Sequence, residues 1–305
     1  MSILVGTASW TDPTLIKSKR FYPSGCTSAE ARLRFYASQF PIVEVDSSYY
    51  AMPSGSNAAL WVERTPPHFV FNIKAFRLFT GHQTPRDTFP GDMQAALPQN
   101  GKANLYYKDM PDAIRNELWR RFLEAVAPLH DAGKLGAVHF QFAPWVTSGP
   151  DGLAHVAHCA EQMPPGYRMA VEFRNRSWFD DAHAASTLAF EREHALVHVV
   201  ADKPQGPANT IPSVWEVTND TLALVRLHGR NQATWNIKGA TASSERFNYD
   251  YNDDELAGLA EEIRKIAAHV AQTHVLFNNN YEDQGQRNAR TLMAMLGNPL
   301  VARGE

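Results

Sequence analysis

Eight short runs of mainly branched apolar residues recur along the chain, and segments with helical periodicity separate most of them. Strands that alternate with helices predict a parallel sheet, because two adjacent parallel strands need a crossover connection. We therefore expect an α/β fold, with residues 1–305 forming a single (β/α)8 barrel of the TIM type. A doubly wound open sheet with extra strands is the alternative. The expected strands are residues 3–7, 42–46, 69–74, 135–142, 168–173, 195–200, 222–227 and 274–279.

Two segments between these strands are long and rich in polar residues, glycine or proline, namely 76–111 and 229–252. Irregular connections of this length in a compact domain are typical of lids and binding loops. We expect both to lie at the mouth formed by the carboxyl ends of the strands.

Seven of the strands have apolar residues at one set of alternate positions and polar residues at the other. In a closed barrel one strand face packs on the helices and the other points into the interior. A ring of buried charges costs too much desolvation to be ordinary packing, so the pattern predicts a ligand or catalytic site. An internal ion-pair network that only fills the lumen is the alternative. The expected inward positions are Glu44 and Asp46, Asn72 and Lys74, His139 and Gln141, Glu172 and Arg174, His198 and Asp202, Arg226 and His228, and Asn278 and Asn280.

The expected interior combines three cations with several carboxylates. Lys74, Arg174 and Arg226 suit a phosphate or carboxylate group on a ligand. Carboxylates and a histidine nearby suit general acid/base catalysis. Our candidate catalytic residues are Glu172, Lys74, Glu44 and His228. Our candidate ligand-binding residues are Arg174, Arg226, Asp46, Gln141, Asp202, Asn278, Asn280, Trp10, Tyr50 and Trp178.

A metal site competes with this interpretation, because Glu172, Asp202, His198 and His228 are all ligand types on neighbouring strands. Lysine and arginine at the same expected interior would repel a metal ion. We therefore expect no cofactor and no metal, with a divalent cation as the alternative.

The composition limits the partners. A net charge of −3 gives the chain no overall attraction to nucleic acid or to anionic membranes. Two cysteines without a close spacing fit a reducing compartment, and we expect neither a signal peptide nor a membrane-spanning stretch. These features predict a cytoplasmic protein without a membrane partner, and they leave its oligomeric state open.

Several short blocks of the sequence resemble the YecE-like family, also catalogued as domain of unknown function seventy-two. The blocks include Gly6-Thr7 with Trp10, Val171-Glu172-Phe173-Arg174, Arg226 with His228-Gly229, and Phe277-Asn278-Asn279. The resemblance spans nearly the whole chain and implies a TIM-type barrel, but it implies no reaction. Asp46 stands where the family pattern leads us to expect asparagine, which adds a negative charge to the site.

The leading hypothesis is a metal-independent enzyme that performs acid/base chemistry on a small anionic ligand at the barrel mouth. One alternative is nucleic-acid binding or processing, which rests on a fold-level likeness of the family to barrels of the endonuclease IV type. The other is a protein that binds a metabolite without consuming it.

Overall fold

The computed structural model describes residues 2–99, 101–205, 211–235 and 243–297, which form a closed barrel of eight parallel strands. In order around the barrel, each strand pairs with the next one along the chain, apart from a short excursion, and the last pairs with the first. The expected (β/α)8 barrel is therefore confirmed. The strands are β1 (Ser2–Ala8), β2 (Ile42–Val45), β3 (Val70–Lys74), β6 (Leu135–Gln141), β7 (Met169–Glu172), β8 (Val197–Asp202), β9 (Leu222–Leu227) and β10 (Gln272–Phe277).

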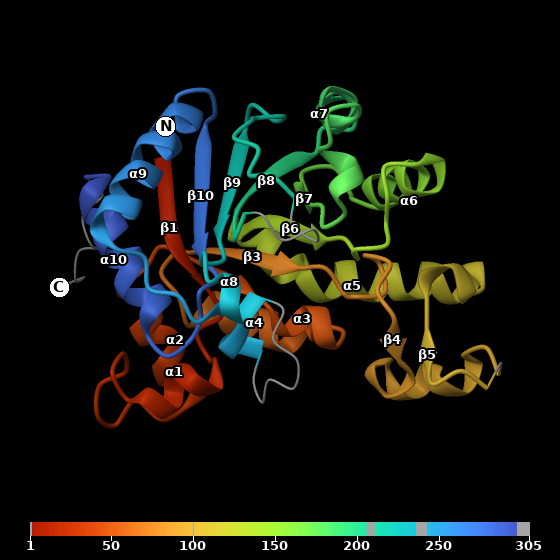
Figure 1. Cartoon of the computed structure of the whole chain (residues 1–305). Helices are drawn as coiled ribbons and strands as arrows, with labels where there is room; N and C mark the ends of the chain where they lie inside the picture. The colour runs from red at the N-terminus through yellow and green to blue at the C-terminus, as the bar shows by residue number, and fades with distance from the viewer. Residues whose placement is uncertain (1, 100, 206–210, 236–242, 298–305) are drawn as a thin grey trace.

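Helices surround this barrel (Figure 1). Amphipathic helix α9 (Asp253–Ala267) begins with a capping box, in which Asn252 accepts the amide of Glu255 and the Glu255 carboxylate accepts the amide of Asn252. None of the helices in the described residues has the length and apolar character needed to cross a membrane. The helices are α1 (Pro13–Ser18), α2 (Ala29–Ala37), α3 (Ser47–Tyr50), α4 (Gly55–Glu63), α5 (Asp112–Asp131), α6 (Pro150–Glu161), α7 (Ala184–Glu193), α8 (Gln232–Trp235), α9 (Asp253–Ala267) and α10 (Gln284–Met295).

The long segment after β3 stands off from the barrel as a small folded excursion (Figure 1). Its two short antiparallel strands are β4 (Thr84–Pro85) and β5 (Asn104–Leu105). Its apolar side chains Phe89, Met93 and Leu97 are each at most 5% exposed and continue the main hydrophobic core. The 3₁₀ turns of the chain are η1 (Arg86–Thr88), η2 (Gly91–Ala96), η3 (Tyr107–Asp109), η4 (Arg176–Trp178) and η5 (Ser243–Phe247).

Alternate residues of the strands separate into two apolar clusters. The outer cluster, between barrel and helices, contains Val43, Phe71, Val171, Val225 and Val275, as the alternation predicts. The inner cluster fills the lower part of the lumen with Ile42, Ala137, Ala170, Leu224 and Leu276. Because the lower lumen is closed by these side chains, the polar residues that share their face are concentrated toward the carboxyl ends of the strands.

The expected alternation is wrong for β8. Val197 and Val199 belong to the inner cluster, whereas Val200 belongs to the outer one. His198 points toward the helices, where its Nδ1 lies 3.1 Å from a carboxylate oxygen of Glu191 in α7. A shift of one residue moves every side chain of a strand to the other face. Because β8 has valines on both faces, the prediction rested on His198 and Asp202, and the buried carboxylate of Glu191 instead pairs His198 with a helix.

Candidate functional site

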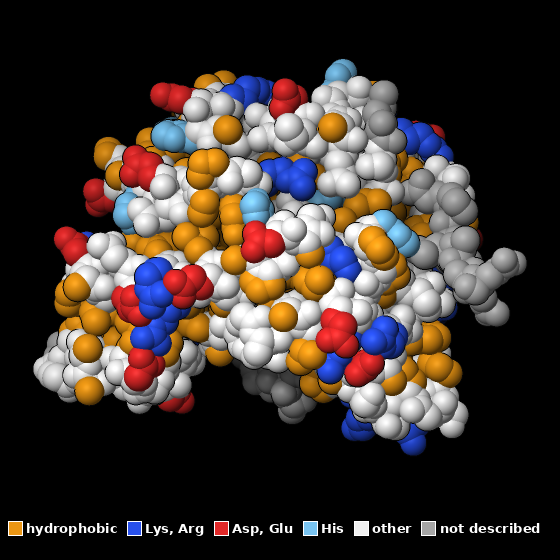
Figure 2. All heavy atoms as spheres, turned by 180° about the vertical axis from the view of Figure 1, so that it is seen from behind, with side chains coloured by type: hydrophobic (Ala, Val, Ile, Leu, Met, Phe, Trp, Pro, Cys, Tyr) orange, Lys and Arg blue, Asp and Glu red, His pale blue; other side chains and the backbone are white. Residues whose placement is uncertain are grey.

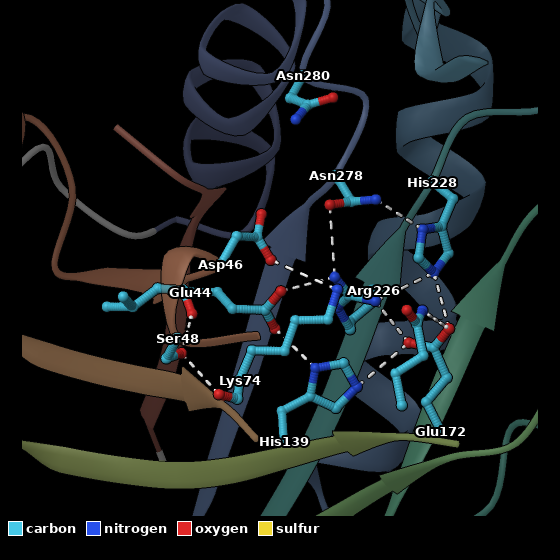
Figure 3. A network of polar contacts seen from close by, with 12 residues as sticks. Glu44, Asp46, Ser48, Lys74, His139, Glu172, Arg226, His228, Asn278 and Asn280 are labelled. Atoms are coloured by element: carbon cyan, nitrogen blue, oxygen red, sulfur yellow. Dashed lines mark hydrogen bonds and ion pairs between the residues drawn. The ribbon is translucent and has the colours of Figure 1, made fainter. Parts of the chain in front are cut away.

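The centre of the polar interior is a buried arginine between two buried carboxylates. Arg226 on β9 is 0% exposed. Its Nη1 lies 2.6 Å from Oε2 of Glu172 on β7, and its Nη2 lies 2.6 Å from Oε1 of Glu44 on β2 (Figure 3). One guanidinium thus links three strands of the barrel, β9, β7 and β2, and two internal carboxylates neutralise its charge.

Two histidines extend this network (Figure 3). His139 on β6 has Nδ1 3.1 Å from Glu44 Oε2 and Nε2 3.3 Å from Glu172 Oε2. His228 has Nε2 3.3 Å from Glu172 Oε1, and the Asn278 amide nitrogen lies 2.9 Å from its Nδ1. Each ring nitrogen of His139 and His228 thus lies within 3.3 Å of a polar atom of the network, although neither nitrogen of His139 meets hydrogen-bond geometry.

Glu172 receives one more contact, from the side chain of Gln141. The Gln141 amide donates to Glu172 Oε1 at 2.7 Å. The structure therefore brings together nine of the predicted interior residues. This network consists of Glu44, His139, Gln141, Glu172, Arg226, His228 and Asn278, with Lys74 and Asp46 beside it.

The electrostatics of the network favour ionised carboxylates. Burial by itself raises the pKa of Glu172, but attraction to Arg226 and the contacts of His228 outweigh burial and hold that pKa well below its usual value. The pKa of Glu44 is low for the same reason, with Arg226 and His139 opposing the effect of burial. Burial lowers the pKa of His228 to about 4 against the pull of Glu172. At neutral pH the interior thus holds two fixed carboxylates and a neutral His228.

Lys74 and Asp46 lie beside the network (Figure 3), and their side chains are 12% and 23% exposed. The Lys74 ammonium is 3.6 Å from Asp46 Oδ1 and 4.9 Å from the centre of the Tyr49 ring. Burial raises the pKa of Asp46, and the charge of Glu44 adds to the effect while Lys74 opposes it. Asp46 is therefore more easily protonated than an ordinary aspartate.

Arg174 follows β7, and the charges of Glu172 and Tyr49 act on its guanidinium. Its side chain is partly buried, and burial lowers its pKa. Within the parts of the chain that the structure describes, its guanidinium makes no hydrogen bond or ion pair.

Lys203 is a site residue that the sequence analysis missed. It follows β8 on the same face as Val197 and Val199 and is only 5% exposed. Burial lowers its pKa to about 8, and the positive charges of Arg174 and Arg226 add to the effect while Glu172 opposes it. No described residue gives its ammonium a hydrogen bond or an ion pair. The one-residue shift of β8 is the signal that identifies it, because Lys203 takes the inward place expected for Asp202.

Asp202 itself lies outside the network. Its carboxylate accepts hydrogen bonds from Arg230, at 2.9 Å, and from the Tyr251 hydroxyl, at 2.6 Å. Asn280 also lies apart (Figure 3), with its amide nitrogen 3.4 Å from Asp12. The structure therefore does not bring these two predicted ligand-binding residues together with Glu172.

The three candidate aromatic residues differ in their surroundings. Trp178 is 0% exposed and stacks on Phe173 with ring centres 3.9 Å apart. Trp10 is 8% exposed and packs edge-on against Trp61. Tyr50 is 53% exposed, so its ring is the one of the three that a ligand can reach without repacking. Trp10 and Trp178 are placed as packing residues of the barrel wall.

The metal alternative has little geometric support in the residues that are described. No three His, Cys, Asp or Glu side chains gather there in a way that could hold a metal ion. His198 faces α7, and Glu44 and Glu172 are held by Arg226. The expectation that the protein uses no cofactor stays a prediction.

The comparisons with known proteins agree with this architecture. The profile described as "Protein of unknown function DUF72" matches residues 4–303. The UPF0759 protein YunF of Bacillus subtilis (strain 168) is 32% identical over 296 residues, which cover 96% of this chain and 94% of that protein.

Two solved structures of DUF72 family proteins are also similar. The one from Enterococcus faecalis V583 is 28% identical with a TM-score of 0.79, and 99% of each chain is covered. The one from Thermotoga maritima MSB8 is 27% identical with a TM-score of 0.75, and 97% of this chain and 100% of that chain are covered. With the family profile matching nearly every residue of a closed eight-stranded barrel, the chain belongs to the DUF72 family of proteins of unknown function.

Proposed function

We propose that the protein is a metal-independent enzyme that performs acid/base chemistry on a small phosphate- or carboxylate-bearing ligand at the barrel mouth. The observation that carries this proposal is the pair Arg174 and Lys203. Both follow neighbouring strands, and both lack a counter-ion in the described part of the chain. Burying a charge without a partner is costly, and proteins rarely do so without a functional reason. An anionic group on a ligand would supply the missing negative charge.

The neighbouring charges favour an anion at Arg174 and Lys203 rather than at Arg226. Arg226 is already paired with two carboxylates and is 0% exposed. Lys74 is a third cation on the open side, since its contact to Asp46 is long, at 3.6 Å, and its side chain is 12% exposed. Arginine offers paired donors to a phosphate or carboxylate, and lysine offers a compact charge. A ligand bound there would lie next to His228 and Glu172, whose electrostatic influence reaches Lys203.

The net charge of −3 and the charges on the face shown in Figure 2 support a small ligand over a polyanionic one. In the view of Figure 2, acidic and basic side chains are interspersed among the described residues, and no basic sector dominates that face. Binding of a nucleic-acid backbone relies on clustered lysines and arginines and weakens steeply with added salt. Salt-sensitive binding of DNA or RNA would favour the nucleic-acid alternative instead.

A thermal-shift screen with phosphorylated sugars and small carboxylic acids tests the proposal. A ligand at one hundred times its Kd stabilises the folded state by about 2.7 kcal/mol, which such a screen detects. We expect Arg174→Met and Lys203→Met to abolish the shift. Arg287→Met, which removes a surface pair with Asp250, is the matched control and should retain it. Ligands that bind equally well to the Arg174 and Lys203 variants would contradict the proposed anion site.

NMR of each stabilising ligand in the presence of the protein then distinguishes an enzyme from a binding protein. Conversion of the ligand by the wild type supports catalysis. Binding without conversion favours the non-catalytic alternative.

A further inference from the structure

His82 lies at the start of the excursion that follows β3, and the site described so far does not use it. The chain turns back at Gly81, whose φ of +78° favours glycine. This turn leaves His82 only 8% exposed, with its ring centre 5.3 Å from that of Tyr49 and 5.8 Å from that of Trp145. Since Tyr49 also contacts Lys74, His82 borders the same mouth.

The hydrogen bonds around His82 determine which ring nitrogen carries the proton. Thr80 Oγ1 lies 3.0 Å from the Arg77 carbonyl oxygen, which can only accept, so the hydroxyl proton of Thr80 is directed there. Thr80 Oγ1 also lies 2.9 Å from His82 Nδ1. With its proton already used, the hydroxyl must accept from an Nδ1–H. The Nε2 atom then carries a lone pair, and no described residue donates a hydrogen bond to it.

The surroundings also keep the ring neutral. Burial lowers the pKa of His82 to about 3, and the positive charges of Arg174, Arg77 and Lys74 add to the effect. No carboxylate contacts this ring among the described residues, in contrast to His139, which lies between Glu44 and Glu172. His82 is therefore a neutral base with a fixed tautomer, next to the cations proposed to hold the anion.

We infer that His82 Nε2 is the general base of this site and removes a proton from a ligand whose anionic group is held by Arg174, Lys203 and Lys74. The inference rests on the proposed function and deepens it. The ligand class is a small acid or phosphate ester with a proton-bearing carbon or hydroxyl near its anionic group. The Nε2 lone pair forms the new N–H bond, and the electron pair of the broken C–H or O–H bond stays on the ligand.

The ligand itself activates this base. Without an anion, three cations oppose a positive charge on His82. A dianion bound among those cations offsets their charge, so the imidazolium becomes easier to form once the ligand is present. The proton affinity of His82 is therefore higher in the complex than in the free protein.

Imidazole ¹⁵N NMR with sulfate as the probe tests the inference, because sulfate does not itself titrate between pH 3 and 8. In the free protein we expect the Nδ1–H tautomer and a midpoint near the pKa of about 3. Saturating sulfate should raise that midpoint by roughly two pH units, a 100-fold gain in proton affinity. Calorimetry at pH 5 in two buffers of different ionisation enthalpy should then show proton uptake on sulfate binding.

Three variants separate the possible outcomes. His82→Asn should bind sulfate within about threefold of the wild type but without proton uptake, since the asparagine amide can still donate to Thr80. Thr80→Val should allow both tautomers in the NMR spectrum. Arg174→Met should lose sulfate binding, and the titration midpoint of His82 should rise only slightly, because one of the three nearby cations is removed.

The inference is overturned if His82 carries its proton on Nε2, titrates near 6.5 in the free protein, or does not respond to bound sulfate. Sulfate binding with no response at His82 refutes the assignment of the base alone. No binding of sulfate or of short carboxylates to the wild type refutes the anion site and the base together.

Discussion

Arg226→Met is the change whose effect the structure defines most sharply. The Arg226 side chain is 0% exposed and contacts Glu44 and Glu172 at 2.6 Å each. Removing it leaves two carboxylates buried without their guanidinium, and breaking a buried ion pair by removing one partner costs about 3–5 kcal/mol. With roughly 2.1 cal/mol/K of unfolding entropy per residue, 305 residues give about 0.64 kcal/mol/K, so Tm should fall by roughly 5–8 °C.

The loss should depend on pH in a defined direction. In the wild type the pKa values of Glu44 and Glu172 lie below those of the unfolded chain, so their stabilisation is present above about pH 4.5 and is lost as the pH falls through the folded values. Without Arg226 burial dominates, and both pKa values should rise above the unfolded value. The variant then gains stability relative to the wild type as the pH falls, and the difference is largest at neutral pH.

Urea denaturation followed by circular dichroism at pH 7.5 and pH 5 measures this difference. The triple variant Arg226→Met, Glu44→Gln and Glu172→Gln should recover much of the loss, because it buries no unpaired charge. Arg287→Met, at an exposed pair, should cost less than about 1 kcal/mol. A loss below about 1 kcal/mol for Arg226→Met, equal at both pH values, would refute the reasoning.

Three other predictions concern residues around the barrel. Lys203→Met should raise the unfolding free energy at pH 7 by about 1–3 kcal/mol, because it removes a buried cation. The wild type should gain unfolding free energy between pH 8 and 10.5, as Lys203 loses its proton, and the variant should not. Equal pH profiles of the two proteins in urea denaturation would contradict this. Burial lowers the pKa of His228 to about 4 and that of His274 to about 3. The unfolded chain therefore binds more protons than the folded one, and wild-type stability should rise from pH 4 to 6.5. A flat stability profile by denaturant titration would be the contrary result. Gly136→Ala should lower the unfolding free energy by about 1–3 kcal/mol, since the new Cβ would lie 2.4 Å from Asn72 Oδ1. Gly258→Ala, on the open face of α9, should raise the unfolding free energy by about 0.5–1 kcal/mol. Similar Tm values for the two variants would count against the steric argument.

The barrel could be predicted from the sequence because strand alternation and helical periodicity agree along most of the chain. Val43 and Phe71 lie on the outer face and Glu44 on the inner face, as local spacing alone indicates. β8 shows where that reasoning ends. In a strand with valines on both faces, the local sequence does not indicate which face points into the barrel. The partner of His198 is Glu191, which comes from helix α7, and the alternation within the strand carries no information about it.

The mouth was less accessible to sequence reasoning than the strands. Lys203 enters the site only after the shift of β8 is known. His82 depends on the turn at Gly81 and on the hydroxyl of Thr80, which no periodicity encodes. Trp10 and Trp178 follow strand ends as a ligand platform would, yet they pack against Trp61 and Phe173. Whether a residue at the mouth lines the site or packs into the barrel wall thus depends on loop conformation, which the composition of the loops does not indicate.

The bridge from Arg226 to Glu44 also has a consequence for how the chain folds. These two residues are 182 positions apart in the sequence, and Arg226 and Glu172 are 54 apart. A partial barrel that ends before β9 would contain both carboxylates and no guanidinium, so half-formed barrels carry an electrostatic penalty that the complete barrel relieves. Contacts of such long range form late, because the entropy of closing the chain must be overcome first. The polar centre should therefore act as a folding checkpoint, which favours ring closure over stable half-barrel intermediates.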